Sequence, residues 1–494
     1  MRIAIVHYHL RPGGVTKVIQ HSLDALAEPA ASNGAAEAVQ PLVLTGEPPA
    51  PDMPVAPYAV IEALGYNTSP AQYAVEHVAT QLETAVKHAL GGRPDVWHFH
   101  NPALGKNLVM PVLVSHLARQ GQPILIQIHD FAEDGRPANY KLLRDYAGPG
   151  DPLKLGAYLY PQGPHVHYAV LNQRDRRFLT AAGVPADRLH DLPNAVRAEE
   201  NGESEQSQKE IAHECLFLYP TRAIRRKNIG EFLLWAAVAE AGERFAVTRA
   251  PKNPLEQPIY QKWVAFAKEL ALPVKFAVGE HWTGDFAALL ASAAALVTTS
   301  VGEGFGLVFL EPWLLRRPLA GRKLPEITTE FERAGLDLTD LYEQIRIPLE
   351  WVGRDRFVQE VRTALTKAYA LYGRPAGADD VKRAVAAAIT EGRIDFGRLN
   401  EPLQQAVIQR LRQTPALKKE ISPATLQPTG EQRRRIQQNE QLVQEQFNLP
   451  AYGKRLRRIY HAAAVSESGA ISGINADALL DQFLTPERFC LLRT

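Results

Sequence analysis

The chain has 494 residues, a formal net charge of +1, 46% apolar residues and 22% charged residues. This length exceeds what one ordinary hydrophobic core organises, so we expect at least two domains. A charge balance this close to neutral gives no electrostatic reason to expect nucleic acid or an anionic membrane as a partner.

Two cysteines, Cys215 and Cys490, lie far apart without the spacing of metal ligands. They favour a reducing compartment and argue against a disulfide framework or a zinc site. The opening segment MRIAIVHYHLRPGG has too short an apolar run for a secretory signal, and no run approaches the roughly 20 apolar residues that cross a bilayer. We expect a cytoplasmic protein; association with a membrane stays possible, although no segment indicates it.

Short apolar segments alternate with amphipathic ones from the start of the chain, a pattern typical of a parallel sheet with crossover helices. In the first half we expect strands at Arg2–Tyr8, Pro41–Thr45, Ala59–Ala63, Asp95–Phe99, Ile124–His129, His167–Leu171 and Arg188–Leu192. Helices are expected at Val15–Leu26, Ala71–Ala89, Asn107–Arg119 and Arg174–Ala181.

The turn after the first strand carries Gly13 and Gly14. It lacks the G-x-G-x-x-G spacing of a nicotinamide dinucleotide site. The two glycines are equally compatible with a plain turn and with a backbone that approaches a phosphate.

Polar side chains cluster where two other strands of this half end. His98, His100 and Asn101 belong to one of them, and His129 and Asp130 to the next. Single histidines at such places are more often structural, but several at neighbouring carboxyl ends indicate a polar pocket, in which His129 is the functional candidate. The H-x-H pair has no carboxylate partner that would make a convincing metal site.

A charged and polar stretch separates the two halves. We expect an N-terminal domain at 1–196, a linker at 197–212 and a second domain at 213–450 with a helical insertion after about 335. Helices at 451–494 are candidates for packing back onto the first domain. The second domain should contain strands at Leu216–Pro220, Phe245–Thr248, Val274–Val278, Ala295–Thr299 and Pro318–Ala320, and helices at Ile229–Ala239, Ile259–Leu270, Phe286–Ala291 and Leu307–Arg316.

The segment Arg222–Lys227, here called the basic turn, contains four cations in six residues at the end of a predicted strand. Doubly wound sheets bind ligands at this edge. Arg222 offers a planar fork and Lys227 a point charge for a diphosphate. The alternative interpretation is a turn that only increases solubility.

The segment Val301–Glu311, here called the acidic loop, follows an apolar strand and contains Gly304 and Gly306. These glycines permit a tight turn and close approach of the backbone to a ligand. A helix starting near Leu307 would aim free amide groups at the turn and favour a diphosphate there. Alternatively, Glu303 is a helix-start charge and Glu311 a solvated residue.

Together these residues resemble the retaining glycosyltransferases of the GT-B fold, family 4 type. The run from Glu303 to Glu311 is similar to the E-x7-E signature of that family, and the other matching motifs occur in the family's order over about residues 1–330. These motifs are the early glycine turn, His129-Asp130, Leu192-Pro-Asn194, Arg222 with Lys227, and Arg317–Glu326, and Tyr452–Tyr460 resembles the family's late helix.

The resemblance implies two doubly wound, Rossmann-like domains facing each other across a cleft, with a helical C-terminal extension. It implies that Arg222 and Lys227 bind the donor diphosphate with the Gly14 backbone, that Glu311 holds the ribose, that Glu303 positions the sugar and that His129 contacts the sugar near its reacting carbon. The catalytic candidates are therefore His129, Arg222, Lys227 and Glu303, and the nucleotide-sugar-binding candidates are Gly13, Gly14, Arg222, Lys227, Glu303, Gly304, Phe305, Gly306, Leu307 and Glu311. Acceptor-side candidates, to which the family passes on no fixed role, are His98, His100, Asn101 and Asp130.

The chain also departs from the family pattern. Ala195 follows Asn194 where the family has glycine, and the glycine-rich stretch expected after Glu326 is not recognisable.

The expected activity is transfer of a hexosyl group from a UDP-, GDP- or ADP-sugar to an acceptor hydroxyl, with retention of configuration and without a metal or other cofactor. A sugar-nucleotide epimerase, a phosphorylase of the same architecture and a non-catalytic nucleotide-sugar-binding protein remain alternatives.

Overall fold

The computed structural model describes residues 1–27, 38–50, 57–69, 73–148, 150–197, 215–423, 426 and 432–493. Backbone contacts divide the chain into two compact units. Unit 1 consists of Met1–Ala195, Leu371–Gly373 and Phe447–Leu484, and unit 2 of Val196–Ala370, Arg374–Gln446 and Thr485–Thr494. Of the linker expected at 197–212, all but Arg197 lies outside the described residues.

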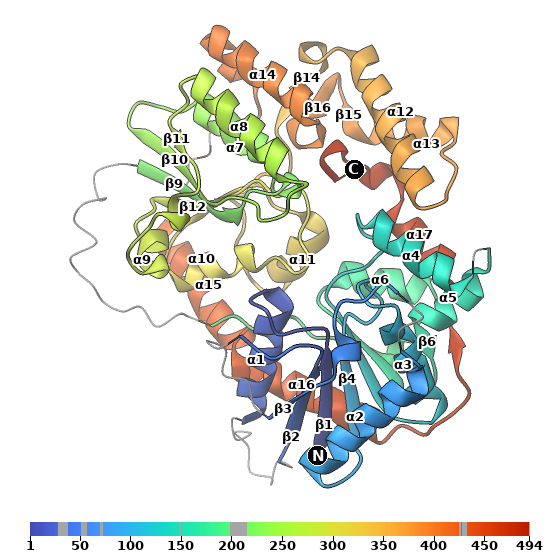
Figure 1. The fold of residues 1–494 in the computed structure, drawn as a ribbon. Helices are drawn as coiled ribbons and strands as arrows, with labels where there is room; N and C mark the ends of the chain where they lie inside the picture. The colour runs from blue at the N-terminus through green and yellow to red at the C-terminus, as the bar shows by residue number, and fades with distance from the viewer. Residues whose placement is uncertain are drawn as a thin grey trace. The chain divides into compact units, whose positions relative to one another are not determined.

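Unit 1 is built on a seven-stranded parallel sheet with the order β3-β2-β1-β4-β5-β7-β8. The chain order reverses between β1 and β4, which defines the switch point of this sheet. The strands are β1 (Arg2–His7), β2 (Gln40–Thr45), β3 (Tyr58–Val60), β4 (Val96–His100), β5 (Ile124–Ile128), β7 (Val166–Val170) and β8 (Leu189–Asp191). Figure 1 shows this sheet in blue to green.

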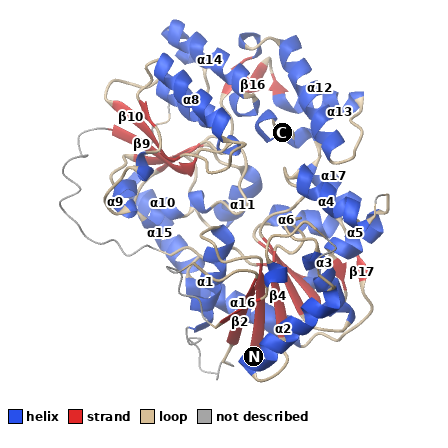
Figure 2. Ribbon diagram, viewed as in Figure 1, coloured by secondary structure: helices blue, strands red, loops and turns tan. Residues whose placement is uncertain are grey.

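Both faces of the sheet are covered, because its strands are apolar on both sides. Ile3 and Ile5 of β1 belong to one apolar core, while Ala4 and Val6 between them belong to the other. Figure 2 shows helices flanking the strands. The expected helices are present as α1 (Gly14–Ala27), α2 (Val75–Leu90), α3 (Val109–Arg119) and α6 (Gln173–Ala181).

The late helix α16 (Leu449–Ala464) packs beside α1 in the same core. The hydroxyls of Ser22 and Tyr452 lie 3.0 Å apart, and Arg457 donates to the carbonyl of Leu26 at 2.8 Å. The short helix α17 (Ala476–Phe483) packs on α5 (Pro152–Leu159) and α6, and α4 (Pro137–Ala147) lies next to α5. Sequence analysis did not anticipate α4 and α5; Asp151 caps α5 by accepting from two backbone amides.

Unit 2 repeats the doubly wound plan with a five-stranded parallel sheet of order β11-β10-β9-β12-β13. Its switch point lies between β9 and β12. The strands are β9 (Cys215–Arg222), β10 (Glu243–Arg249), β11 (Val274–Lys275), β12 (Ala295–Thr298) and β13 (Leu319–Gly321), and the helices are α7 (Ile229–Ala237), α8 (Gln257–Glu269), α9 (Phe286–Ala291), α10 (Glu311–Leu314) and α11 (Pro325–Arg333).

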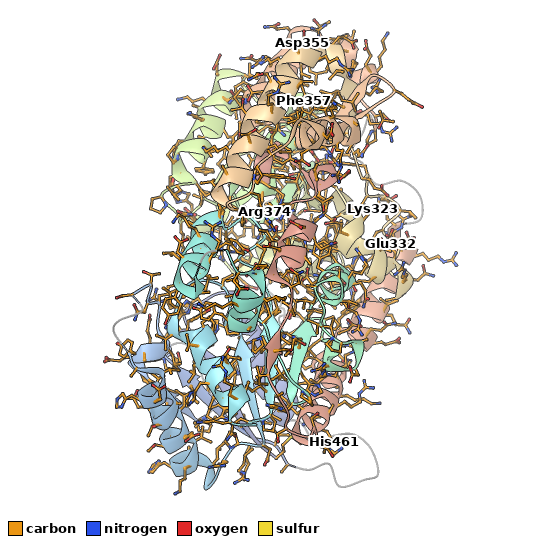
Figure 3. The ribbon with its side chains drawn as sticks, turned by 90° about the vertical axis from the view of Figure 1, so that its right-hand side faces the viewer. Lys323, Glu332, Asp355, Phe357, Arg374 and His461 are labelled. Carbon is orange, nitrogen blue, oxygen red and sulfur yellow. The ribbon has the colours of Figure 1, made fainter. Side chains whose placement is uncertain are left out.

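The insertion after about 335 forms a small antiparallel sheet and further helices, which a buried charge network joins to the parallel sheet. Arg322, directly after β13, pairs with Glu231 of α7 at 2.6 Å and with Asp395 of β16 at 2.8 Å. The added elements are β14 (Arg346–Pro348), β15 (Ile389–Thr390), β16 (Arg393–Asp395), α12 (Arg354–Leu371), α13 (Ala378–Ala388), α14 (Glu401–Gln413) and α15 (Gln432–Gln446). Lys323 and Glu332, labelled in Figure 3, pair at 3.1 Å and fix α11.

One expected helix is wrong. Leu307–Arg316 is not one helix but a 3₁₀ turn at Leu307–Phe309 followed by the four-residue α10. Pro312 explains the break, because proline has no amide hydrogen to donate and its ring clashes with the carbonyl four residues earlier. The long helix expected to begin near Leu307, with its N-terminal amides directed at the acidic loop, is therefore not formed.

Among the described residues, none of the helices combines the length and the apolar character that crossing a membrane requires.

Candidate active site

The basic turn and the acidic loop both lie at the switch point of the unit 2 sheet. The basic turn follows β9 and the acidic loop follows β12, and these two strands are neighbours. In doubly wound sheets the crevice at this point, outside the carboxyl ends of the strands, is where ligands bind. The fold thus brings together two segments almost 80 residues apart in sequence, and a hydrogen bond from Lys227 to Glu303 joins them.

Glu303 joins the two segments through its carboxylate. One oxygen accepts a hydrogen bond from the Lys227 ammonium group, and the other lies 3.1 Å from the Arg226 guanidinium. The backbone contributes as well, since the amide of Val301 donates to the carbonyl of Arg226 at 2.9 Å. The acidic loop is therefore held against the basic turn by charge and by backbone hydrogen bonds.

Burial and charge oppose each other in this cluster. Burial alone would raise the pKa of Glu303, but Lys227 and Arg226 outweigh it, and the pKa lies below its ordinary value. Burial lowers the pKa of Lys227, whereas Glu303 and Glu311 act in the opposite direction. Glu311, the first residue of α10, thus contributes to the same electrostatic cluster.

The four cations of the basic turn have different surroundings. Arg225 is anchored by Glu401 of α14 through contacts of 2.6 and 3.0 Å, which makes it a structural residue. Arg222 is exposed at the end of β9. Lys227 retains 15% of its side-chain exposure, compared with 42% for Arg226. Arg226 was not assigned a role from the sequence, although it lies in the same run of cations.

The chain turns sharply at Asn228, between the basic turn and α7. Its φ of 52° is left-handed, a conformation that asparagine tolerates better than most residues, and its side chain caps α7. The Asn228 side chain also accepts a hydrogen bond from Gln404 of α14 at 2.8 Å. Sequence reasoning missed this residue, although an asparagine directly before an apolar helix is a recognisable cap signal.

Gly306 of the acidic loop has the conformation for which glycine was expected there. Gly306 has a φ of 94°, and a Cβ atom there would lie 2.8 Å from the ring of Phe309. Phe305 is 5% exposed and packs edge-on against Phe331 of α11. Gly304 and Leu307 flank these positions in the same turn, so the backbone of the acidic loop has a defined course.

In unit 1, four histidines gather near the carboxyl ends of β1, β4 and β5. We call His7, His98, His100 and His129 the histidine cluster; all four are buried. His100 and His129 share a hydrogen bond of 2.9 Å between Nδ1 and Nε2, with nearly parallel rings. Burial lowers the pKa of His7 and His98 to about 3 and that of His129 to about 4. The rings are therefore neutral near pH 7.

The expected acceptor-side residues have structural partners. His98 uses one ring nitrogen for the Tyr460 hydroxyl at 2.8 Å and the other for Gln127 at 3.1 Å. Asn101 accepts hydrogen bonds from the amides of His129 and Asp130 at 2.6 and 3.2 Å. These contacts fix the side chains of His98 and Asn101 within unit 1.

Asp130 pairs with Arg136 at 2.9 Å, and the rings of His98 and His100 lie tilted against each other with their centroids 4.3 Å apart. Among the described residues, no three histidine, cysteine or acidic side chains are grouped so that they could hold a metal ion.

Gly13 and Gly14 lie at the start of α1 and are exposed. A Cβ atom at Gly14 would meet nothing within 4 Å, and one at Gly13 only the carbonyl of Arg11 at 3.7 Å. Packing in unit 1 therefore does not require glycine at either position, which leaves the backbone accessible to a ligand.

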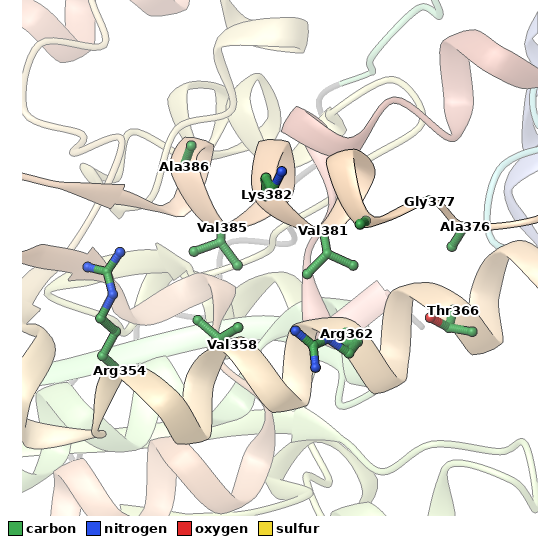
Figure 4. A pocket seen from close by; sticks show the side chains of 11 residues that line it. Arg354, Val358, Arg362, Thr366, Ala376, Gly377, Val381, Lys382, Val385 and Ala386 are labelled. Atoms are coloured by element: carbon green, nitrogen blue, oxygen red, sulfur yellow. The ribbon is translucent and has the colours of Figure 1, made fainter.

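A groove between α12 and α13 of unit 2, shown in Figure 4, is separate from these residues. Val358, Val381 and Val385 line it together with Arg354 and Arg362. None of the candidate site residues lines it.

The fold is similar to that of several solved structures. The chain matches no family model. The mannosylglucosyl-3-phosphoglycerate synthase of Petrotoga mobilis is 26% identical over 349 residues, and the match spans 65% of this chain and 65% of that protein. Sucrose-phosphate synthase from Thermosynechococcus elongatus has a TM-score of 0.50 at 15% identity, covering 93% of this chain and 98% of its own.

HepE from Anabaena, solved in complex with UDP, has a TM-score of 0.53 at 13% identity, covering 93% of this chain and 99% of its own. Both likenesses extend over almost the whole of the present chain. The chain has a GT-B fold, the class predicted from its sequence.

Proposed function

We propose that the protein is a glycosyltransferase that moves a hexosyl group from a nucleotide-diphosphate sugar to an acceptor hydroxyl, with retention of configuration and without a required metal ion. The main support for the proposal is that the basic turn and the acidic loop contact each other at the switch point of the unit 2 sheet. The name of the Petrotoga mobilis relative and the UDP bound to HepE support it.

The chemistry rests on stabilising the leaving group. Negative charge develops on the diphosphate as its bond to the anomeric carbon breaks, and fixed cations at that point lower the barrier. We assign this role to Arg222 and Lys227. Lys227 is already held in place by its partner Glu303, so little rearrangement is needed when charge develops.

Glu303 has a double role in this proposal. Before the donor binds, its carboxylate holds Lys227 and Arg226 in position. Each carboxylate oxygen has a second acceptor position, so Glu303 can keep both cations in place and still accept hydrogen bonds from hydroxyls of the donor sugar. We further assign Glu311 to the ribose hydroxyls, the Phe305–Leu307 backbone to the sugar, and His129 to the region of the reacting carbon, as the family resemblance implies.

The test is a transfer assay with UDP-, GDP- and ADP-hexoses and a panel of hydroxyl acceptors. The panel includes glucosyl-3-phosphoglycerate, a choice guided by the name of the Petrotoga mobilis relative. NMR coupling constants of the anomeric proton report retention, and excess EDTA tests the need for a metal ion. Isomerised donor or phosphate-dependent cleavage would instead favour the epimerase or phosphorylase, and nucleotide binding without turnover a binding protein.

A further inference from the structure

The C-terminal segment Thr485–Arg493 belongs to unit 2, although α17 directly before it belongs to unit 1. In Figure 1 the segment is dark red and carries the C-terminal label. It contains two 3₁₀ turns, Pro486–Arg488 and Leu491–Arg493, and the side chains of Leu491 and Leu492 are buried. Residues 451–494 were candidates for packing back onto the first domain, but this last part of them belongs to unit 2.

Several side chains fix the course of the segment on unit 2. Arg488 forms a bidentate pair with Glu326 of α11 at 2.6 and 2.8 Å. Glu487 pairs with Arg383 of α13 at 2.7 Å, and the Cys490 thiol donates to a backbone carbonyl after β16 at 3.3 Å. The segment is therefore anchored at successive points before it reaches its last residues.

This course brings Arg493 to the predicted donor site. The turn Leu491–Arg493 contacts the Arg225–Lys227 part of the basic turn. A Cβ atom at Gly302 would lie 3.4 Å from both Cζ and Nε of Arg493, so the guanidinium lies against the acidic loop directly before Glu303. The carbonyl of the same Gly302 accepts a hydrogen bond from Arg226.

We propose that Arg493 is a further donor-binding residue, whose guanidinium contacts the diphosphate of the nucleotide sugar. The inference rests on the function proposed above. Lys227 and Arg226 share their charge with Glu303, so a cation from outside the basic turn adds positive potential where the diphosphate binds. The planar fork of arginine matches two phosphate oxygens at once.

A guanidinium packed against a loop could instead have only a structural role, and ligands with and without phosphates separate the two roles. Wild type, Arg493→Ala and Arg493→Lys are titrated calorimetrically with UDP, GDP and ADP and with the matching nucleosides. We expect Arg493→Ala to weaken binding of the preferred diphosphate about 10- to 100-fold and to leave nucleoside binding unchanged. Arg493→Lys should recover part of the loss, because it retains the charge.

Arg383→Ala is the matched control, because it removes another arginine that contacts the same segment. Its ion pair with Glu487 is about half exposed and contributes little, so binding should match wild type. The inference is overturned when Arg493→Ala binds the diphosphate as wild type does, loses nucleoside and diphosphate affinity equally, or is matched by Arg383→Ala. A wild-type protein that binds none of the three diphosphates contradicts the proposed function itself.

Discussion

Replacing Lys227 by alanine tests the leaving-group argument at its centre. Lys227 is one of two cations that share Glu303, and its side chain is only 15% exposed. Removing a preorganised donor from developing negative charge typically costs about 3 kcal/mol, or roughly 10²–10³ in rate. We therefore expect kcat of Lys227→Ala to fall by that factor with the preferred donor.

The folded state should tolerate this change. Arg226 still faces Glu303 at 3.1 Å, so the carboxylate keeps one partner, and we expect a loss of about 1–3 kcal/mol in the free energy of unfolding. Thermal melting of Lys227→Ala, Glu303→Gln and the double variant separates folding from catalysis. Because Lys227 and Glu303 are in contact, their effects on stability should couple by about 0.5–3 kcal/mol.

The assay is initial-rate kinetics with the donor concentration varied at saturating acceptor. A folded Lys227→Ala protein whose kcat stays within threefold of wild type would refute the reasoning. A rise in KM with unchanged kcat would place Lys227 in ground-state binding alone.

Further predictions concern positions with different physical causes. Gly14→Ala should fold as wild type does, because the added Cβ meets nothing within 4 Å, yet it should raise KM for the donor; unchanged donor kinetics would remove the backbone contact assigned to Gly14. Glu133 is 1% exposed, and burial raises its pKa from 4.5 to about 7, so stability falls as pH rises from about 4.5 to about 7. Glu133→Gln should remove up to about 3 kcal/mol of this decrease in the free energy of unfolding. Denaturant titrations of wild type and Glu133→Gln at pH 5 and 8 test this, and the same pH dependence in both proteins would contradict it. Burial lowers the pKa of the histidine cluster, to about 4 for His129. In the Glu133→Gln protein, which lacks the opposing effect of Glu133, unfolding should therefore become easier as pH falls from 6.5 towards 4. A melting temperature of that variant unchanged over this range would argue against buried neutral rings.

The two parallel sheets could be predicted because their strands are short apolar runs separated by amphipathic helices. The acidic loop and the basic turn could be placed together because both follow strands of one parallel sheet. The insertion was harder, because α15 is rich in polar residues and only Asn439 and Val443 of it are buried. Their packing depends on partners distant in sequence, as in the 2.9 Å contact of Asn439 with Asp337.

Two features of the site could not be predicted from the sequence. The H-x-H pattern in β4 places His98 and His100 on one face of the strand, but that α16 covers this face with Tyr460 is a tertiary fact. Arg493 approaches the acidic loop from almost 200 residues further along the chain, as the Gly302 contact shows. No local pattern around Arg493 indicates this position.

The most direct test is to locate a bound nucleoside diphosphate crystallographically, using whichever of UDP, GDP and ADP binds most tightly. The account predicts density for the diphosphate within hydrogen-bonding distance of Arg222 and Lys227, beside the acidic loop. Density in the groove between α12 and α13, or at any place remote from the switch point of the unit 2 sheet, would contradict it.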